Sequence, residues 1–142
     1  MQRAFTLVEV MVVILILGLI TALAAPRVWR WADRLAVASA TQEIASFYAR
    51  ARFSAVYHGR RLRIVLDQDS LAATVEAAVD SVLWRQVGPG GRGVVLQSSR
   101  SVIRLYPSGL GLGGANTKLV LRRGAAAESL TISRTGRLKR WP

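Results

Sequence analysis

The first apolar run of the chain extends from Phe5 to Ala25 and contains one charged residue, Glu9. A helix of this length would measure about 31 Å at 1.5 Å per residue, close to the thickness of a bilayer's hydrocarbon core. Valine, isoleucine and leucine occur on every side of such a helix, so none of its faces is polar. The pattern predicts a helix that crosses a membrane, with the span expected over residues 5–26.

A second pattern follows Pro26, which lacks a backbone N–H and is expected to end or kink the first helical segment. Beyond it, apolar residues recur at spacings of three and four, as on one face of a helix. These residues are Val37, Ala40, Ile44, Phe47, Tyr48, Ala51 and Ala55. Arg34, Glu43, Arg50 and Arg52 fall on the other face, and Gly59 is a suitable stop. We therefore expect an amphipathic continuation of the helix over residues 27–58.

The period changes to two after Gly59. Residues 60–67 alternate, with Leu62, Ile64 and Leu66 on one face of a strand. Residues 71–80 are compatible with either helix or strand. Five further short strands are expected, over Val82–Val87, Val94–Gln97, Val102–Tyr106, Lys118–Arg122 and Leu130–Arg134. The pattern predicts an α+β fold, in which one long N-terminal helix packs on a mostly antiparallel β-sheet that spans residues 59–142.

The carboxylate of Glu9 needs an explanation, because a charged group inside a membrane helix costs on the order of 2–3 kcal/mol or more. A secretory signal peptide would end at Ala22-Leu23-Ala24, but it has no use for Glu9 and its apolar core would be shorter. A plain signal anchor is the other alternative. Three arginines follow the span, Arg27, Arg30 and Arg34. By loop charge alone they would keep the residues after the span in the cytoplasm.

The residues around this carboxylate resemble a known motif. Ala4-Phe5-Thr6-Leu7-Val8-Glu9 looks like the processing motif of type IV pilins and type II secretion pseudopilins, with Ala4 where those proteins usually have glycine. The resemblance implies that a prepilin peptidase removes residues 1–4 by cutting between Ala4 and Phe5, and that the new amine of Phe5 is methylated. It also implies that Glu9 pairs with the amine of a neighbouring subunit during assembly.

The C-terminal part of the chain extends the resemblance. Leu105-Tyr106-Pro107-Ser108-Gly109, Leu119-Val120-Leu121 and Leu130 through Arg137 are similar to the C-terminal pattern of the GspH/FimT family. These are minor pseudopilins of type II secretion and minor pilins of type IV pili. The resemblance implies a non-enzymatic subunit of a hetero-oligomeric filament, made with other pseudopilins or pilins. It further implies a single-pass protein of the bacterial inner membrane, with its globular domain in the periplasm.

The charge of the chain adds a second functional hypothesis. The formal net charge is +12, and arginine greatly outnumbers lysine. Such a balance indicates attraction to phosphate or to anionic lipid headgroups, or serves only to solubilise the domain. The tail carries Arg137, Lys139 and Arg140 beside Trp141. Its Gly136-Arg137-Leu138-Lys139-Arg140 resembles the Gly-Arg-x-Arg motif of DNA-binding FimT-type pilins, which implies DNA capture; the alternative is a solvated last turn.

Nothing else in the sequence suggests chemistry. The single histidine, His58, stands at the expected helix end, and Asp67 and Asp69 are read as a turn. Gly109-x-Gly111-x-x-Gly114 matches a dinucleotide-binding motif by letters, but a strand follows it where that motif needs a helix. The chain has no cysteine. We expect no catalytic site, cofactor or metal, and read Trp29 and Trp31 as anchors at the level of the lipid headgroups or as contacts to a neighbouring helix.

Overall fold

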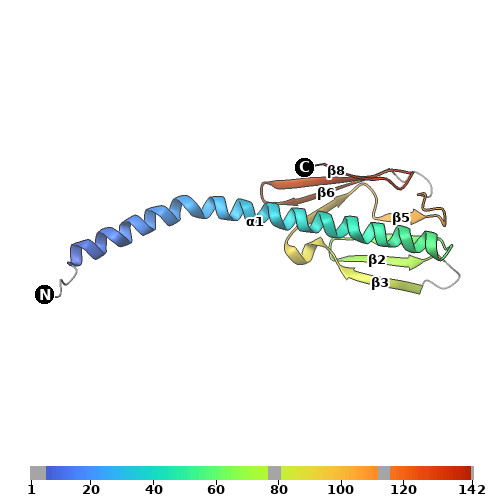
Figure 1. Cartoon of the computed structure of the whole chain (residues 1–142), viewed down its shortest axis with the longest axis horizontal. Coiled ribbons are helices and arrows are strands. Elements are labelled where there is room, and N and C mark those ends of the chain that lie inside the picture. Colours follow the sequence, from blue (N-terminus) through green and yellow to red (C-terminus); the bar gives the residue numbers. More distant parts are fainter. Residues whose placement is uncertain (1–5, 77–80, 112–115, 142) are drawn as a thin grey trace. The chain divides into compact units, whose positions relative to one another are not determined.

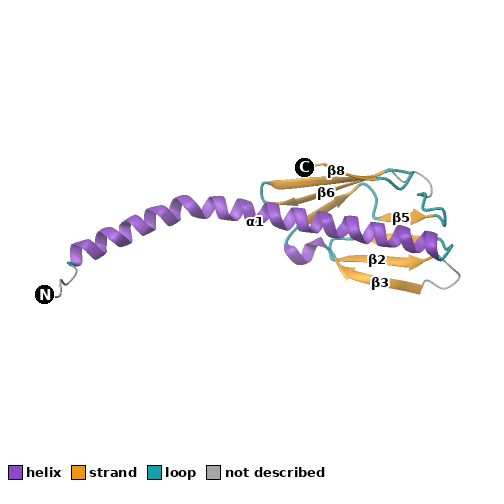
Figure 2. Cartoon of the chain, viewed as in Figure 1, coloured by secondary structure: helices purple, strands orange, loops and turns teal. Residues whose placement is uncertain are grey.

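The computed structural model describes residues 6–76, 81–111 and 116–141. It contains one long helix, α1 (Leu7–Tyr57), followed by eight described strands and a short 3-10 helix (Figures 1 and 2). The helix continues through Pro26 and does not end there. The chain forms two compact units, residues 1–32 and residues 33–142.

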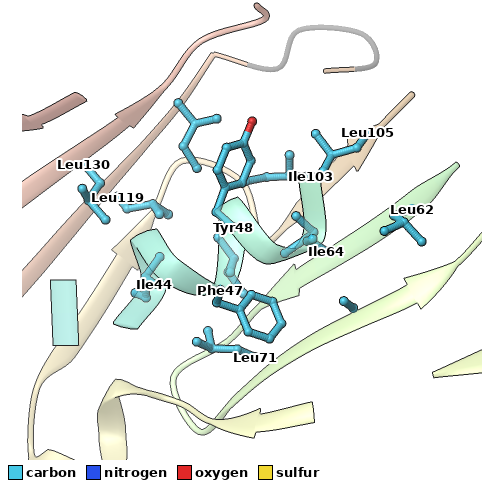
Figure 3. Packing of buried hydrophobic residues seen from close by; sticks show 14 of the residues in the cluster. Ile44, Phe47, Tyr48, Leu62, Ile64, Leu71, Ile103, Leu105, Leu119 and Leu130 are labelled. Atoms are coloured by element: carbon cyan, nitrogen blue, oxygen red, sulfur yellow. The ribbon is translucent and has the colours of Figure 1, made fainter. Parts of the chain in front are cut away.

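The second unit is built around the helical stripe expected from the sequence. Each of the seven apolar residues expected on that stripe, from Val37 to Ala55, is at most 3% exposed. The side chains interlock with strand residues from both sheets (Figure 3). Phe47 points towards Leu71, and Ile44 lies on the side of Leu119 and Leu130. The amphipathic pattern was therefore a reliable signal for the core.

The strands form two four-stranded antiparallel sheets. Sheet A has the order β3-β2-β1-β5 and sheet B the order β4-β6-β7-β8. The strands of sheet A are β1 (Leu62–Leu66), β2 (Ser70–Val75), β3 (Ser81–Val87) and β5 (Val102–Leu105). Those of sheet B are β4 (Val95–Ser98), β6 (Thr117–Arg123), β7 (Ala126–Ile132) and β8 (Leu138–Trp141). The α+β class is confirmed, and the expected sheet is divided in two.

The side chain of Gln68, in the turn between β1 and β2 of sheet A, forms hydrogen bonds at the start of β4 in sheet B. Its Nε2 donates to the Val94 carbonyl oxygen at 2.7 Å, and its Oε1 accepts from the Leu96 N–H at 2.7 Å. The 3-10 helix η1 (Pro89–Arg92) begins beside it, and the Gly90 N–H donates to the Gln68 carbonyl oxygen. A Cβ at Gly88 would clash with that same oxygen. Asp67 and Asp69 belong to this turn, as the sequence predicted.

Three details differ from the sequence expectations. The first part of the ambiguous stretch 71–80 is strand, because β2 covers Ser70–Val75; residues 77–80 lie outside the described residues. The strand expected over Leu130–Arg134 begins at Ala126 and ends at Ile132, because pairing with β6 includes Ala126 and Ala127. The tail was not expected to be a strand, but Leu138–Trp141 pairs with β7 from Ile132 back to Ser129. Lys139 and Arg140 are adjacent, so the tail lacks the alternation of apolar and polar residues that predicts a strand.

Candidate functional site

The first candidate site is the N-terminal part of α1. Every described residue from Thr6 to Ala32 is exposed, and this part of the helix is strongly apolar. By length and composition α1 is able to cross a membrane. A helix with such a surface is stable only in lipid or against other apolar surfaces, because exposed apolar area in water is unfavourable.

Glu9 is the one charged residue in the first turns of this helix. Its backbone N–H donates to Thr6 Oγ1 at 3.3 Å and to the Thr6 carbonyl oxygen at 3.1 Å, so Thr6 caps the helix start. Its side chain forms no ion pair with any residue that the structure describes. The predicted cleavage and methylation positions, Ala4 and Phe5, lie outside the described residues.

Trp29 and Trp31 follow this segment and are 73% and 65% exposed. Arg30 between them donates from Nε to the Pro26 carbonyl oxygen at 3.1 Å. The exposure of both indoles suits either role expected for them, because each ring is free to meet a headgroup layer or a neighbouring helix.

The second candidate site is the tail. Arg137, Lys139 and Trp141 line a shallow pocket of about 210 Å³ together with Thr131 and Ser133 of the β7 side. Lys139 Nζ lies 3.6 Å from the centre of the Trp141 ring, a cation–π contact. The Arg137 N–H donates to Ser133 Oγ, so the turn between β7 and β8 is closed by side chain as well as backbone.

The third basic residue of the tail lies apart from this pocket. Arg140 alternates with Lys139 along β8 and therefore faces the opposite side of sheet B. Its guanidinium binds Glu128 in a bidentate way, with Nε to Oε2 at 2.9 Å and Nη2 to Oε1 at 2.7 Å. This hydrogen bond to Glu128 raises the pKa of Arg140 further above its ordinary value. The structure thus brings Arg137 and Lys139 together and places Arg140 elsewhere.

The glycine before Arg137 has a structural reason. Gly136 has a positive φ of 77°, and a Cβ there would lie 2.7 Å from the Gly109 carbonyl oxygen and 2.8 Å from Arg52 Nε. Arg52 in turn donates from Nε to that Gly109 oxygen at 3.0 Å. Two loops and α1 therefore meet at one point, which only glycine at position 136 permits. This contact accounts for the Pro-Ser-Gly and Thr-Gly-Arg pattern without reference to DNA.

The remaining polar positions suggest no catalytic arrangement. His58 is exposed just after α1, with Nδ1 3.1 Å from the Ser54 carbonyl oxygen. Gly109 and Gly111 frame a turn, and Gly114 lies outside the described residues. Within the described ranges no group of three or more histidine and carboxylate side chains is placed to hold a metal ion.

Sequence reasoning missed two hydroxyl groups and one pairing. Thr131 and Ser133 join the pocket because alternate residues of β7 face the same side. Period-two alternation through Ser133 was the signal for them. The Arg140–Glu128 pair depends on the register between β7 and β8, which no local pattern gives.

Comparisons with known proteins agree with this architecture. Residues 1–25 match the prokaryotic N-terminal methylation motif, and residues 40–136 match the type II transport protein GspH. A comparison with curated proteins gives no significant match.

Two kinds of solved structure share the fold. The chain is similar to the type IV minor pilin FimU of Pseudomonas aeruginosa (strain PAO1), with a TM-score of 0.67 and 20% identity over 77% of this chain and 90% of that one. It is also similar to the minor pseudopilin EpsH of the type 2 secretion system of Vibrio cholerae. There the TM-score is 0.55 and the identity 16%, over 71% of this chain and 94% of that one.

The GspH match covers more than half of the chain, and the resemblance and pilin-like fold expected from the sequence are both confirmed. This protein belongs to the family of the type II transport protein GspH, a family of minor pseudopilins and minor pilins.

Proposed function

We propose that this protein is a minor pseudopilin of a type II secretion system, a non-enzymatic structural subunit of a periplasmic pilus-like filament. The observation that supports this most is the exposed apolar surface of α1 from Leu7 to Ala32, interrupted in its first turns by Glu9 alone. Such a surface has to be covered by lipid and then by other helices.

The proposed sequence of events combines that surface with the match of residues 1–25 to the N-terminal methylation motif. A prepilin peptidase cuts between Ala4 and Phe5 and methylates the Phe5 amine. The single span holds the subunit in the inner membrane with its globular domain in the periplasm. On assembly, the apolar surface moves from lipid to the helices of other pseudopilins. Glu9 then pairs with the amine of a neighbouring subunit, which removes the cost of an isolated carboxylate.

Substitution of Glu9 tests the assembly step. The chain has no cysteine, so a single cysteine introduced at an exposed position of α1 can carry a cross-linker, and every cross-link from this subunit then starts at that position. We expect Glu9→Gln to remove most cross-links to other filament subunits in the host membrane, while membrane insertion is unchanged. Val8→Leu is the matched control and should retain them. Normal cross-linking by Glu9→Gln would contradict the assigned role of the carboxylate.

Deletion of the gene tests the system to which the filament belongs. Loss of protein secretion with normal pilus function and DNA uptake supports the secretion role. Intact secretion with a defect in pilus function or transformation contradicts it, and favours a minor type IV pilin.

The second candidate function is that of a FimT-like minor type IV pilin that binds DNA for uptake in natural transformation. The pocket that Arg137 and Lys139 share with Trp141 favours it, with Arg140 on the same strand. The test is a salt series with the full chain in neutral detergent and the triple variant Arg137→Ala, Lys139→Ala, Arg140→Ala. Binding by the wild type that is lost in the triple variant supports this function; equal binding by both contradicts it.

A further inference from the structure

Four exposed cations lie on one of the two faces of sheet B, whereas Arg123 and Arg140 lie on the other face and pair with Asp33 and Glu128. Leu119, Leu121, Leu130 and Ile132 point into the core, so the residues between them point outward. We call this side the outer face of sheet B, defined by Lys118 and Arg122 of β6, Arg137 beside β8, and Lys139 of β8. All four are exposed.

The strand register fixes how these cations are spaced. Lys118 pairs with Thr131, and Thr131 pairs with Lys139, so the two lysines share one row across three strands. Strands lie about 4.8 Å apart, which puts the two Cα atoms about 10 Å from each other. Arg122 is four residues from Lys118 on the same strand, about 14 Å away at 3.4 Å per residue.

No carboxylate in the described part of the chain neutralises this face. Asp33 pairs with Arg123, Glu43 with Arg92, Glu128 with Arg140, and Glu76 with both Arg63 and Arg104. Asp67 and Asp69 lie in the turn between β1 and β2 of sheet A. None of the four cations of the outer face forms an ion pair among the described residues. The residues between them, such as Thr131 and Ser129, are uncharged. Uncompensated charge at this density attracts a polyanion.

Trp141 does not offer a free ring for base stacking. One face of its indole is covered by the Lys139 ammonium, 3.6 Å from the ring centre. The ring holds the lysine at the edge of the pocket, where the charge is available to an anion. Single-stranded nucleic acid is usually held by successive exposed aromatic rings, and this one lies against a cation.

We propose that the outer face of sheet B binds the phosphate backbone of double-stranded DNA through Lys118, Arg122, Arg137 and Lys139. This inference rests on the second candidate function, and it differs from the tail motif in two ways. Lys118 and Arg122, far from the tail in sequence, contribute to binding. Arg140, bound to Glu128 on the other face, does not. Contact is to phosphates and is independent of base sequence.

The test measures binding of the full chain, in neutral detergent, to a fluorescent mixed-sequence duplex of about 20 base pairs over a salt series. Four phosphate contacts predict a slope of log K against log salt of about −3.6. Lys118→Gln with Arg122→Gln, and separately Arg137→Gln with Lys139→Gln, should each reduce the slope by about 1.8. The charge-retaining pair Lys118→Arg with Arg122→Lys should keep the wild-type slope, which separates loss of charge from loss of fold.

The control removes the same charge elsewhere. Arg60→Gln with Arg85→Gln takes two exposed arginines from outside this face, and Arg140→Gln removes the paired one. Both should leave the slope unchanged. An equal fall in these controls would overturn the inference in favour of diffuse attraction by net charge.

Three other results distinguish failure of this inference from failure of the function on which it rests. If only the Arg137 and Lys139 pair lowers the slope, the tail binds DNA and the extended face is overturned. If the wild type binds no duplex even at low salt, DNA binding and the extended face both fail. A single strand of equal length that binds more tightly than the duplex, and loses that advantage in Trp141→Ala, would overturn the phosphate-only mode.

Discussion

The two parts of α1 have the same backbone conformation and opposite surroundings. From Leu7 to Ala32 every residue is exposed, and from Val37 to Ala55 one stripe is almost completely buried. The second part is stabilised by a core that the chain itself supplies. The first part has no such core, so its stability depends on lipid or on other subunits. The burial pattern along α1 therefore separates the part that packs into the chain's own core from the part whose apolar surface is left for lipid or other subunits.

The carboxylates repeat this contrast. Asp33, Glu43, Glu76 and Glu128 in the second unit each pair with at least one arginine, and the other two carboxylates described there, Asp67 and Asp69, are exposed in the turn before β2. Glu9 in the first unit pairs with no described residue. Under the proposed function, another subunit supplies the cation that this carboxylate on an apolar helix surface needs.

Truncation of a core side chain should have the largest effect on the unfolding free energy, and it tests the difference between the two parts of α1 most clearly. Phe47→Ala is expected to lower the unfolding free energy of the globular unit by about 3–5 kcal/mol, because it removes a buried ring and leaves a cavity. Leu15→Ala, 70% exposed in the first unit, should change it by less than about 0.5 kcal/mol. Denaturant unfolding followed by near-ultraviolet circular dichroism measures both. Equal effects would contradict the separation of the two units.

Two glycines of the second unit allow the cost of a tertiary clash to be compared with the cost of a positive φ alone. Gly136→Ala should cost about 3 kcal/mol, because the new Cβ meets the Gly109 carbonyl oxygen and Arg52 in addition to a positive φ. Gly59 has a similar φ of 61° but no atom within 4 Å, so Gly59→Ala should cost only about 1 kcal/mol. Thermal melts of the two variants compare them directly. A smaller loss for Gly136→Ala than for Gly59→Ala would contradict the described junction.

Tyr48 shows that burial in the core is not uniformly favourable. Its hydroxyl is buried and has no hydrogen-bond partner among the described residues. Tyr48→Phe should therefore raise the unfolding free energy by about 1 kcal/mol at neutral pH. A loss of stability in Tyr48→Phe would indicate a hydrogen bond that the structure lacks.

The same residue predicts a pH dependence. Burial raises the pKa of Tyr48 above 10.0, and the nearby Arg52 charge opposes the shift. The unfolded chain therefore loses the phenolic proton first, and stability falls as pH rises from about 10 through the folded-state pKa. The difference in unfolding free energy between Tyr48→Phe and wild type should grow over this range, as urea titrations at pH 8 to 11 would show. A constant difference would contradict the buried hydroxyl.

The smallest expected effect on stability concerns the ion pair between Arg140 and Glu128, on the face of sheet B opposite to Lys139. Arg140→Ala should lower the unfolding free energy by about 0.5 kcal/mol, because the Arg140 side chain is 41% exposed and water screens the pair. The loss should shrink in 1 M salt. Arg137→Ala is the control, because its side chain is exposed and forms no ion pair with a described residue, and it should have no measurable effect. An effect of Arg140→Ala that salt leaves unchanged would contradict an ionic origin.

Most of the fold could be predicted from periodicity. The stripe from Val37 to Ala55 and the alternation of Leu62, Ile64 and Leu66 each follow from burial of one face, which leaves a direct record in the sequence. The start of β7 and the existence of β8 could not be predicted. Their pairing is set by partners distant in the chain, and β8 has charges on both faces.

The candidate sites divide in the same way. Glu9 was identifiable, because a charge in an apolar run is conspicuous. The grouping of Arg137 and Lys139 without Arg140 was hidden, since it requires the two faces of β8 to be told apart. Lys118 and Arg122 carry no local signal, because exposed cations on a strand are ordinary until the register places them beside others.

The most direct test of the account is the intact mass of the mature protein from host membranes. The account predicts a chain that begins at Phe5, carries one added methyl group, and retains the whole apolar part of α1. A chain that begins at Ala25 would contradict it, because the surface assigned to assembly would then be a discarded signal peptide.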